Sequence, residues 1–434
     1  MSQPTPSTMK PFTRIDLSVH KHSGYVLFVL SLVSFFNYAD RAIISMLLQP
    51  IKEDLLLSDT QLGFLTGFAF AIIYAICGIP LARLADKKSR VAMLSVIMVF
   101  WTAMTALCGA AQNFVHLFLA RVGVGVGEAG CFPASTSLLC DYFPQERRAF
   151  ALGMFQSAGA LGVMVAMMLS GYIADTFGWR WAFFVISAPG LLVAALVWFT
   201  VQDGRRANLN REVIQEKSIS PSWLEAVSIL LRRPTYRKIL MAYSLGYFAL
   251  YGITQWIPTY IVRYHGISLT DIGLYYGFTV GLGGFIGSVV GSVFSVKLIA
   301  RNRRWELYIP CLAFSVSAPL FALVFFLPTF HSILICIFFA GLISSIGLGP
   351  GYASVQSVAE PHLRATAVAI VLFFIALIGQ GAGPFMVGFF SDYLAQYYGE
   401  DSLQVSLIGS TVIIFIAAFY YYLASKTLEQ DRVS

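Results

Sequence analysis

Twelve long apolar stretches constrain the fold of this chain more than any other feature. A transmembrane helix needs about 20 predominantly apolar residues to cross roughly 30 Å of hydrocarbon. Stretches of that kind run approximately over 25–48, 60–84, 91–110, 114–138, 149–173, 180–201, 237–262, 271–296, 306–328, 331–357, 365–390 and 404–424. With 57% hydrophobic and only 12% charged residues, the chain has too little polar surface for a water-soluble protein. The sequence therefore predicts an all-α membrane protein with twelve transmembrane helices.

Basic residues are distributed unevenly between the two predicted sides of the membrane. Of the 29 Lys and Arg residues, 24 lie in the termini, the central linker and the loops of one side, three lie in loops of the other side, and two lie within spans. Positive residues collect on the cytoplasmic side, so we expect both termini in the cytoplasm. The asymmetry also explains the net charge of +7 without a nucleic-acid partner. The sequence contains no N-x-S/T glycosylation site, which favours a bacterial cell (inner) membrane.

Cysteine and histidine positions give no sign of a metal or redox centre. The six cysteines lie in or at the ends of spans without metal-ligand spacing, and the six histidines lie at span ends or in loops. Neither G-x-x-x-x-G-K-[S/T] nor H-E-x-x-H occurs. We therefore expect no cofactor, and we disfavour an ATP-driven pump, a membrane enzyme or a signalling scaffold.

The second half of the sequence repeats landmarks of the first at an offset of 217 residues. The matched pairs include Gly130 with Gly347, Pro133 with Pro350, Arg147 with Arg364, Gly171 with Gly388, and Asp175 with Asp392. Internal repeats are a hallmark of secondary transporters. The predicted organisation is a cytoplasmic N-terminal segment (1–24), a six-helix bundle (25–202), a cytoplasmic linker (203–236), a second six-helix bundle (237–424) and a cytoplasmic tail (425–434). In the linker, Ser222 and Glu225 form a candidate capping box before an amphipathic helix expected at the inner membrane surface.

Four charged residues lie deep within predicted spans, away from the span ends: Asp40, Arg41, Arg121 and Glu128. A charge inside the membrane costs several kcal/mol unless it is paired or hydrated, so each is a functional hypothesis. At offset 217, Arg121 meets Phe338 and Glu128 meets Ser345. Charge chemistry is therefore predicted to belong to the first half.

The first span carries a polar stripe at helical spacing. Its members are Ser34, Asn37, Tyr38, Arg41 and Ser45. Asp40 lies about 100° around the helix from Arg41, so the two neighbours are expected to face different partners. Counting depth from the outer ends predicts an Asp40–Arg121 pair with Glu128 below it. Glycines at 123, 125 and 127 let a neighbouring helix approach.

These charges suggest two roles. A carboxylate whose arginine partner moves between conformations binds and releases a proton, so Asp40 and Glu128 are the candidates for proton coupling. The planar forks of Arg41 and Arg121 suit a phosphate or carboxylate. The alternative is a static buried ion pair that only fixes helix packing.

The seventh span adds a candidate aromatic wall. Tyr243, Tyr247, Tyr251 and Thr254 follow helical spacing, with Gln255 and Trp256 beside them. They predict either a cavity wall or ordinary aromatic packing. Together with Arg41 and Arg121, the candidate substrate-binding residues are Asn37, Tyr38, Tyr247 and Tyr251. Phe35 and Phe36 are expected near an acyl or alkyl tail.

The segment "ARLADKKSR" after the second span resembles the loop motif G-x-x-x-D-R/K-x-G-R of the major facilitator superfamily. Asp86, Lys87 and Arg90 match it, while Ala82 and Ser89 replace its glycines. The resemblance implies two six-helix bundles, a monomer, and a cytoplasmic gate that includes Asp86 and Arg90.

Within that superfamily, "NYADR" followed by "RVGVGVGEAGCFPASTSLLCDYF" resembles the Spinster branch, which includes sphingosine-1-phosphate and lysophospholipid transporters. Asp40, Arg41, Arg121 and Glu128 fall on its charged positions. The resemblance implies a proton-linked secondary transporter that moves an amphipathic, lipid-like anion by alternating access. Organic-anion symporters of the superfamily carry a similar "NY-x-D-R", so a proton-coupled symporter of a small organic anion remains the alternative. The expected partners are this small-molecule substrate, protons and the lipid bilayer.

Overall fold

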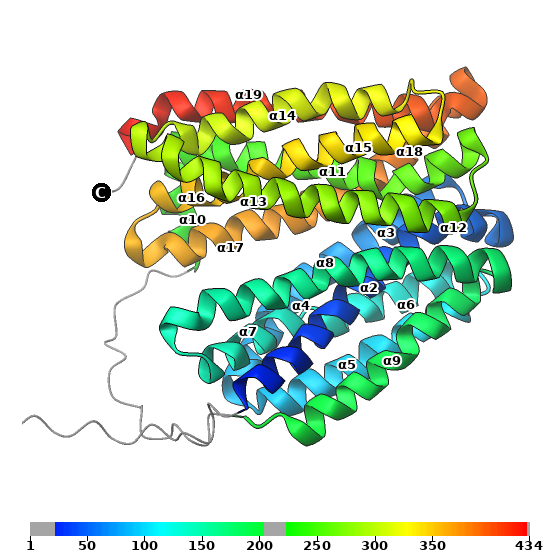
Figure 1. Cartoon of the computed structure of the whole chain (residues 1–434), viewed down its shortest axis with the longest axis horizontal. Coiled ribbons are helices and arrows are strands. Elements are labelled where there is room, and N and C mark those ends of the chain that lie inside the picture. The colour runs from blue at the N-terminus through cyan, green and yellow to red at the C-terminus, as the bar shows by residue number, and fades with distance from the viewer. Residues whose placement is uncertain (1–21, 204–222, 432–434) are drawn as a thin grey trace, which may run out of the picture.

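The computed structural model describes residues 22–203 and 223–431, and their helices form two bundles that lie side by side (Figure 1). In the first bundle, α3 and α4 share the second predicted span, and α6 and α7 share the fourth. Its helices are α2 (Ser23–Leu55), α3 (Asp59–Thr66), α4 (Phe68–Lys87), α5 (Arg90–Gly109), α6 (Phe114–Glu128), α7 (Cys131–Tyr142), α8 (Gln145–Phe177) and α9 (Trp179–Thr200).

The second bundle begins with the short linker helix α10 (Trp223–Arg232), which packs against α11 and α17 and buries Ala226 and Leu230. Ser222 of the expected capping box lies outside the described residues. The remaining elements are α11 (Pro234–His265), α12 (Leu269–Asp271), η2 (Ile272–Tyr276), α13 (Gly277–Arg301), α14 (Trp305–Val324), α15 (Phe330–Ile346), α16 (Leu348–Ser357), η3 (Pro361–Leu363), α17 (Arg364–Phe374), η4 (Ile375–Ala382), α18 (Gly383–Tyr398), η5 (Gly399–Asp401) and α19 (Ser402–Asp431).

The predicted multi-span helical architecture is confirmed. Within the described residues, ten stretches are long and apolar enough to cross a membrane. The last of them, Pro361–Asp431, contains both of the final two predicted spans. The helix α11 covers the predicted seventh span but is not one of these ten stretches of the described residues. Its tyrosines and other polar residues lower its mean hydropathy.

Several predicted spans are broken helices, and one of these breaks occurs at the same repeat position in both bundles. The fourth span divides into α6 and α7 at Gly130, and the tenth divides into α15 and α16 at Gly347. A Cβ at Gly130 would lie 2.7 Å from Cε of Met93, and one at Gly347 would lie 2.8 Å from Cα of Pro310. Glycine at both repeat positions therefore permits close packing of the broken helix against its neighbour.

The two bundles approach each other most closely at the end of the molecule that carries α3 and α12, on the right of Figure 1. We call this the α3–α12 end, and the opposite end, which carries α7 and α10, the α7–α10 end. A Cβ at Gly67 would lie 2.1 Å from the carbonyl oxygen of Gly381, and one at Gly273 would lie 2.4 Å from that of Met167. Backbone meets backbone at these positions, so the α3–α12 end is closed.

Candidate functional site

A cavity of about 290 Å³ lies between the two bundles. The first bundle contributes Tyr38, Arg41, Ala42, Ser45, Thr66, Phe70, Arg121, Val163 and Met167 to its lining. The second contributes Tyr251, Thr254, Gln255, Tyr276, Val280 and Gln380. Both cationic side chains of the lining therefore come from the first bundle.

Arg41 is held by an ion pair and by aromatic rings. Its Nε donates a hydrogen bond of 2.6 Å to Oε2 of Glu128 on α6, whose side chain is fully buried. Its guanidinium carbon lies 5.3, 4.9 and 4.8 Å from the ring centroids of Tyr38, Phe70 and Tyr74. Cation–π attraction at such distances adds to the ion pair. About one fifth of the Arg41 side chain remains exposed at the cavity.

The predicted Asp40–Arg121 pair is wrong. Asp40 instead turns to α5, where its Oδ2 accepts a hydrogen bond of 3.2 Å from Oγ1 of Thr105 and where it also lies beside Trp101. The ion pair across these helices joins Arg41 to Glu128. Asp40 and Arg41 do face different partners, because adjacent helical residues point about 100° apart. The partners depend on how α5 and α6 are arranged around α2. The spacing of residues along a single helix does not predict that arrangement.

Arg121 lies in the same wall and forms no ion pair with a carboxylate of the described residues. Its side chain is buried, its guanidinium carbon lies 5.4 Å from the Phe70 ring, and its Nε has no hydrogen-bond acceptor among the described residues. A buried donor without a partner costs about 1–3 kcal/mol.

The glycines of α6 allow this helix to pack closely against its neighbours. A Cβ at Gly125 would lie 3.1 Å from the carbonyl oxygen of Phe70, and one at Gly127 would lie 2.6 Å from Cβ of Trp101. The predicted close approach therefore occurs on two sides of α6, against α4 and α5.

The wall of the second bundle is uncharged and hydrogen-bonding. Nε2 of Gln380 donates to the hydroxyl of Tyr251 at 2.8 Å, beside Thr254 and Gln255. Gln380 lies in the π-helix η4, and Tyr276 ends the π-helix η2. Such segments occur frequently at functional sites. The sequence reasoning missed Gln380, although a lone amide in the apolar run "FFIALIGQGAG" is the signal that an intramembrane polar residue gives.

The tyrosines of α11 divide between the two predicted alternatives. Tyr251 lines the cavity, whereas Tyr243 is buried and stacks on Tyr247 with ring centroids 6.0 Å apart. Trp256 is also buried and donates to the carbonyl oxygen of Pro384. Tyr247 lies between these environments, because it also packs on Tyr251.

Three other predicted residues lie away from the cavity lining. Asn37 is buried beside Glu128, and Phe35 and Phe36 pack edge to face with centroids 5.1 Å apart. None of the three is among the lining residues. Of the predicted polar stripe, only Tyr38, Arg41 and Ser45 reach the cavity.

Arg90 of the loop motif joins three elements within the first bundle. Its Nη2 pairs with Asp141 of α7 and, at 2.7 Å, with Oδ1 of Asp203 just after α9. Its Nη1 donates to Oγ of Ser137 at 2.9 Å. The side chain of Asp86 lies outside the described residues. In this conformation Arg90 therefore fastens α5 to its own bundle.

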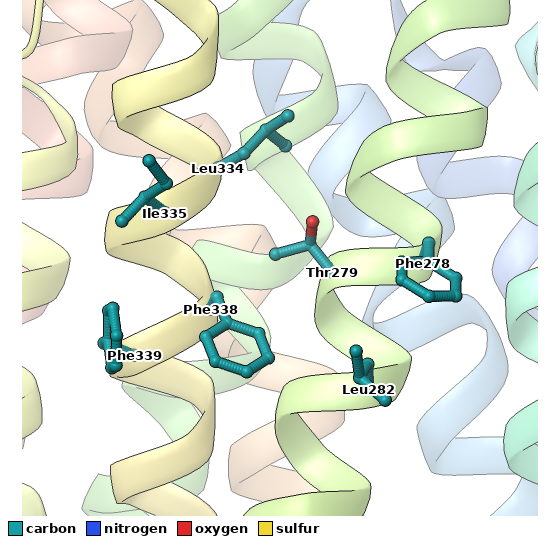
Figure 2. A pocket seen from close by; sticks show the side chains of 7 residues that line it. All are labelled: Phe278, Thr279, Leu282, Leu334, Ile335, Phe338 and Phe339. Carbon is teal, nitrogen blue, oxygen red and sulfur yellow. The ribbon is translucent and has the colours of Figure 1, made fainter.

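A shallow apolar groove of about 250 Å³ lies between α13 and α15 (Figure 2). Phe338, the repeat counterpart of Arg121, lines it together with Phe278 and Leu334. The position that carries a cavity cation in the first bundle therefore carries an apolar ring in the second.

Two repeated helical bundles around a charged cavity are typical of a secondary transporter. The chain belongs to the Major Facilitator Superfamily, whose sequence profile it matches over residues 30–384. This is a family of transporters and not of enzymes.

Three similar proteins illustrate this membership. An MFS-type efflux pump of Mycolicibacterium smegmatis is 34% identical over 93% of this chain and 93% of its own. The sphingosine-1-phosphate transporter SPNS2 of Danio rerio is 25% identical over 93% of this chain and 84% of its own. A bacterial homologue of the human lysosomal transporter Spinster, solved in an inward-facing and unoccupied conformation, superposes with a TM-score of 0.85 at 28% identity and covers 95% of this chain and 99% of its own. The resemblance to the Spinster branch is confirmed.

Proposed function

We propose that this transporter moves an amphipathic, lipid-like anion of the lysophospholipid or sphingosine-phosphate type by alternating access, linked to proton movement. The observation that carries the proposal is the pair of arginines in one cavity wall. About one fifth of the Arg41 side chain is exposed there, and Nε of Arg121 has no hydrogen-bond acceptor among the described residues. A phosphate or carboxylate head group would accept hydrogen bonds from both.

Cavity size favours a head-group site with the tail outside it. Ligand pockets usually measure about 300–1,000 Å³, and this cavity of about 290 Å³ is at the lower limit. A head group fills it, so a long tail extends along the interface of the bundles. The packed rings of Tyr247 and Tyr251, with centroids 5.8 Å apart, supply an apolar surface for that tail. Tyr38 and Asn37 position the arginine and glutamate beneath the head group.

The charge pattern supports an orientation with both termini and the α7–α10 end in the cytoplasm. With its α3–α12 end closed, the molecule is then inward-facing, as is the solved Spinster homologue with which it superposes. Asp86 and Arg90 lie at the cytoplasmic end in this orientation, and we assign them to the gate that closes there in the opposite state.

Proton coupling is assigned to Asp40 and Glu128. Both carboxyls are buried, and Glu128 shares Arg41 with the incoming anion. A buried carboxylate that loses its counter-charge costs several kcal/mol. Anion binding at Arg41 therefore favours uptake of a proton by Glu128. Asp40 is linked to the same site because it interacts electrostatically with both Glu128 and Arg121.

The cargo is tested by binding of a long-chain and a short-chain phosphate with the same head group to the purified transporter in nanodiscs. The long-chain compound is expected to bind at least about tenfold more tightly, because burying each CH₂ contributes about 0.8 kcal/mol. Equal affinities would overturn the lipid assignment. They would favour the second candidate, a proton-coupled symporter of a small organic anion, which the small cavity volume also accommodates.

A further inference from the structure

Two aspartates at the closed end form matching contacts between the bundles. On α18, Oδ1 of Asp392 accepts from the backbone N–H of Asp59 at 3.1 Å, and Oδ2 accepts from the N–H and the Oγ1 of Thr60 at 2.7 and 2.6 Å. On α8, Oδ2 of Asp175 accepts from the N–H and the Oγ1 of Thr270, both at 2.7 Å. Each carboxylate thus binds the first turn of a helix that belongs to the other bundle.

A glycine four residues before each aspartate completes the contact. A Cβ at Gly388 would lie 2.1 Å from the carbonyl oxygen of Asp59, and one at Gly171 would lie 2.1 Å from that of Leu269. The receiving turns also match, since Ser58 and Ser268 cap them with their hydroxyls. Gly171 and Gly388 are repeat partners, as are the two aspartates, so the same contact occurs twice, once from each half of the chain.

We propose that the two G-x-x-x-D segments, Gly171–Asp175 and Gly388–Asp392, are a paired gate latch that must release for the α3–α12 end to open. The proposal rests on alternating access and not on the cargo or on proton coupling. A carboxylate stabilises a helix N-terminus through its free N–H groups and the helix dipole. Both latches lose these bonds once the bundles separate at this end, so they stabilise the closed state alone.

The two latches differ in strength. Asp59 beside the Asp392 latch is buried and accepts from Lys52, from Ser391 and from both Nη atoms of Arg263, at 2.7–2.8 Å. Arg263 belongs to the second bundle, so it adds an ion pair across the same gap. Asp175 is exposed and has no such network within the described residues. We therefore expect the Asp392 latch to contribute more to closure.

The test measures the gate directly by spin-label distances. Labels at Gln112→Cys and His331→Cys, exposed residues of the two bundles at this end, are placed in the full chain with its native cysteines replaced. Asp392→Ala is expected to raise the ratio of long to short distances about tenfold, equivalent to about 1.4 kcal/mol. Asp175→Ala is expected to raise it about threefold because water competes for its exposed bonds, and the double variant more than either.

Asp54→Ala is the matched control, because Asp54 pairs with Arg180 at the same end but within the first bundle. Its distances are expected to stay those of the parent. Distances in both latch variants equal to those of this control would overturn the proposal, and so would a lowered Tm without a distance change.

A second pair of variants leaves the charges in place and adds a methyl group where the two bundles are in contact. Gly388→Ala and Gly171→Ala are expected to lengthen the distance, whereas Gly409→Ala, whose Cβ meets nothing within 4 Å, is not. These variants decide the matter if Asp392→Ala fails to fold. Because no cargo is added, a shifted distance together with absent lipid binding would contradict the proposed function and leave the latch standing.

Discussion

The two bundles share a fold but present opposite walls to the cavity between them. The first supplies Arg41 and Arg121, backed by the buried carboxyls of Glu128 and Asp40. The second supplies hydroxyl, amide and aromatic groups, with Gln380 bonded to Tyr251. The backbone landmarks of the repeat persist on both sides, since Gly130 and Gly347 break equivalent spans. Packing positions were therefore retained while the charges were confined to one half.

The difference assigns separate work to each half. Under the proposed function, the charged wall binds and releases the anion and the proton, whereas the uncharged wall adapts to the shape of the cargo. Phe338 shows the divergence at one position, since it lines an outer apolar groove where its counterpart Arg121 lines the cavity (Figure 2).

The largest effect is expected from removing the carboxyls of the first half. Glu128→Gln and Asp40→Asn each keep the shape of the side chain but cannot titrate, so pH-dependent transport in proteoliposomes is expected to be abolished. Insertion and folding should be unchanged. Glu306→Gln, at a buried glutamate of the second bundle away from the cavity, is the control and should keep the parent pH profile. If both cavity variants keep that profile as well, the static ion pair is the correct interpretation.

The arginine fork gives the next largest effect. Arg41→Lys keeps the charge but loses the planar donors and the stacking on Tyr38, Phe70 and Tyr74. Affinity for a phosphate-headed amphipath is expected to fall about tenfold, or about 1.4 kcal/mol. Arg233→Lys, at a similarly exposed arginine outside the cavity, should leave it unchanged. An unchanged affinity in the Arg41→Lys variant would contradict the assignment of the head-group site to Arg41.

The uncharged wall is expected to give the smallest effect. Gln380→Leu removes the hydrogen bond to Tyr251, and a neutral hydrogen bond contributes about 0.5–1.5 kcal/mol. We expect a change of a few-fold in KM for transport, with the pH profile intact. Loss of the pH dependence in this variant would show that the second half also takes part in proton coupling.

The sequence predicted most of the fold because the thickness of the membrane determines how long each apolar run must be, and twelve such runs can be recognised. It also identified the four charges inside the spans, since intramembrane charge can be read directly from the residue types. It assigned Asp40 the wrong partner, because the rotation of α5 and α6 around α2 depends on side-chain packing between helices. The π-helices that carry Tyr276 and Gln380 were missed for a related reason. A π-helix differs from an α-helix by a wider turn, which leaves no characteristic residue pattern in the sequence.

The most direct test of the division between the halves counts the protons taken up when an anion binds. Calorimetric titration of a phosphate-headed amphipath in two buffers of different ionisation enthalpy gives that number. The parent transporter and Gln380→Leu are expected to take up about one proton per anion bound, and Glu128→Gln is expected to bind the anion with less than about half that uptake. Unchanged uptake in Glu128→Gln, or its loss in Gln380→Leu, would contradict the account.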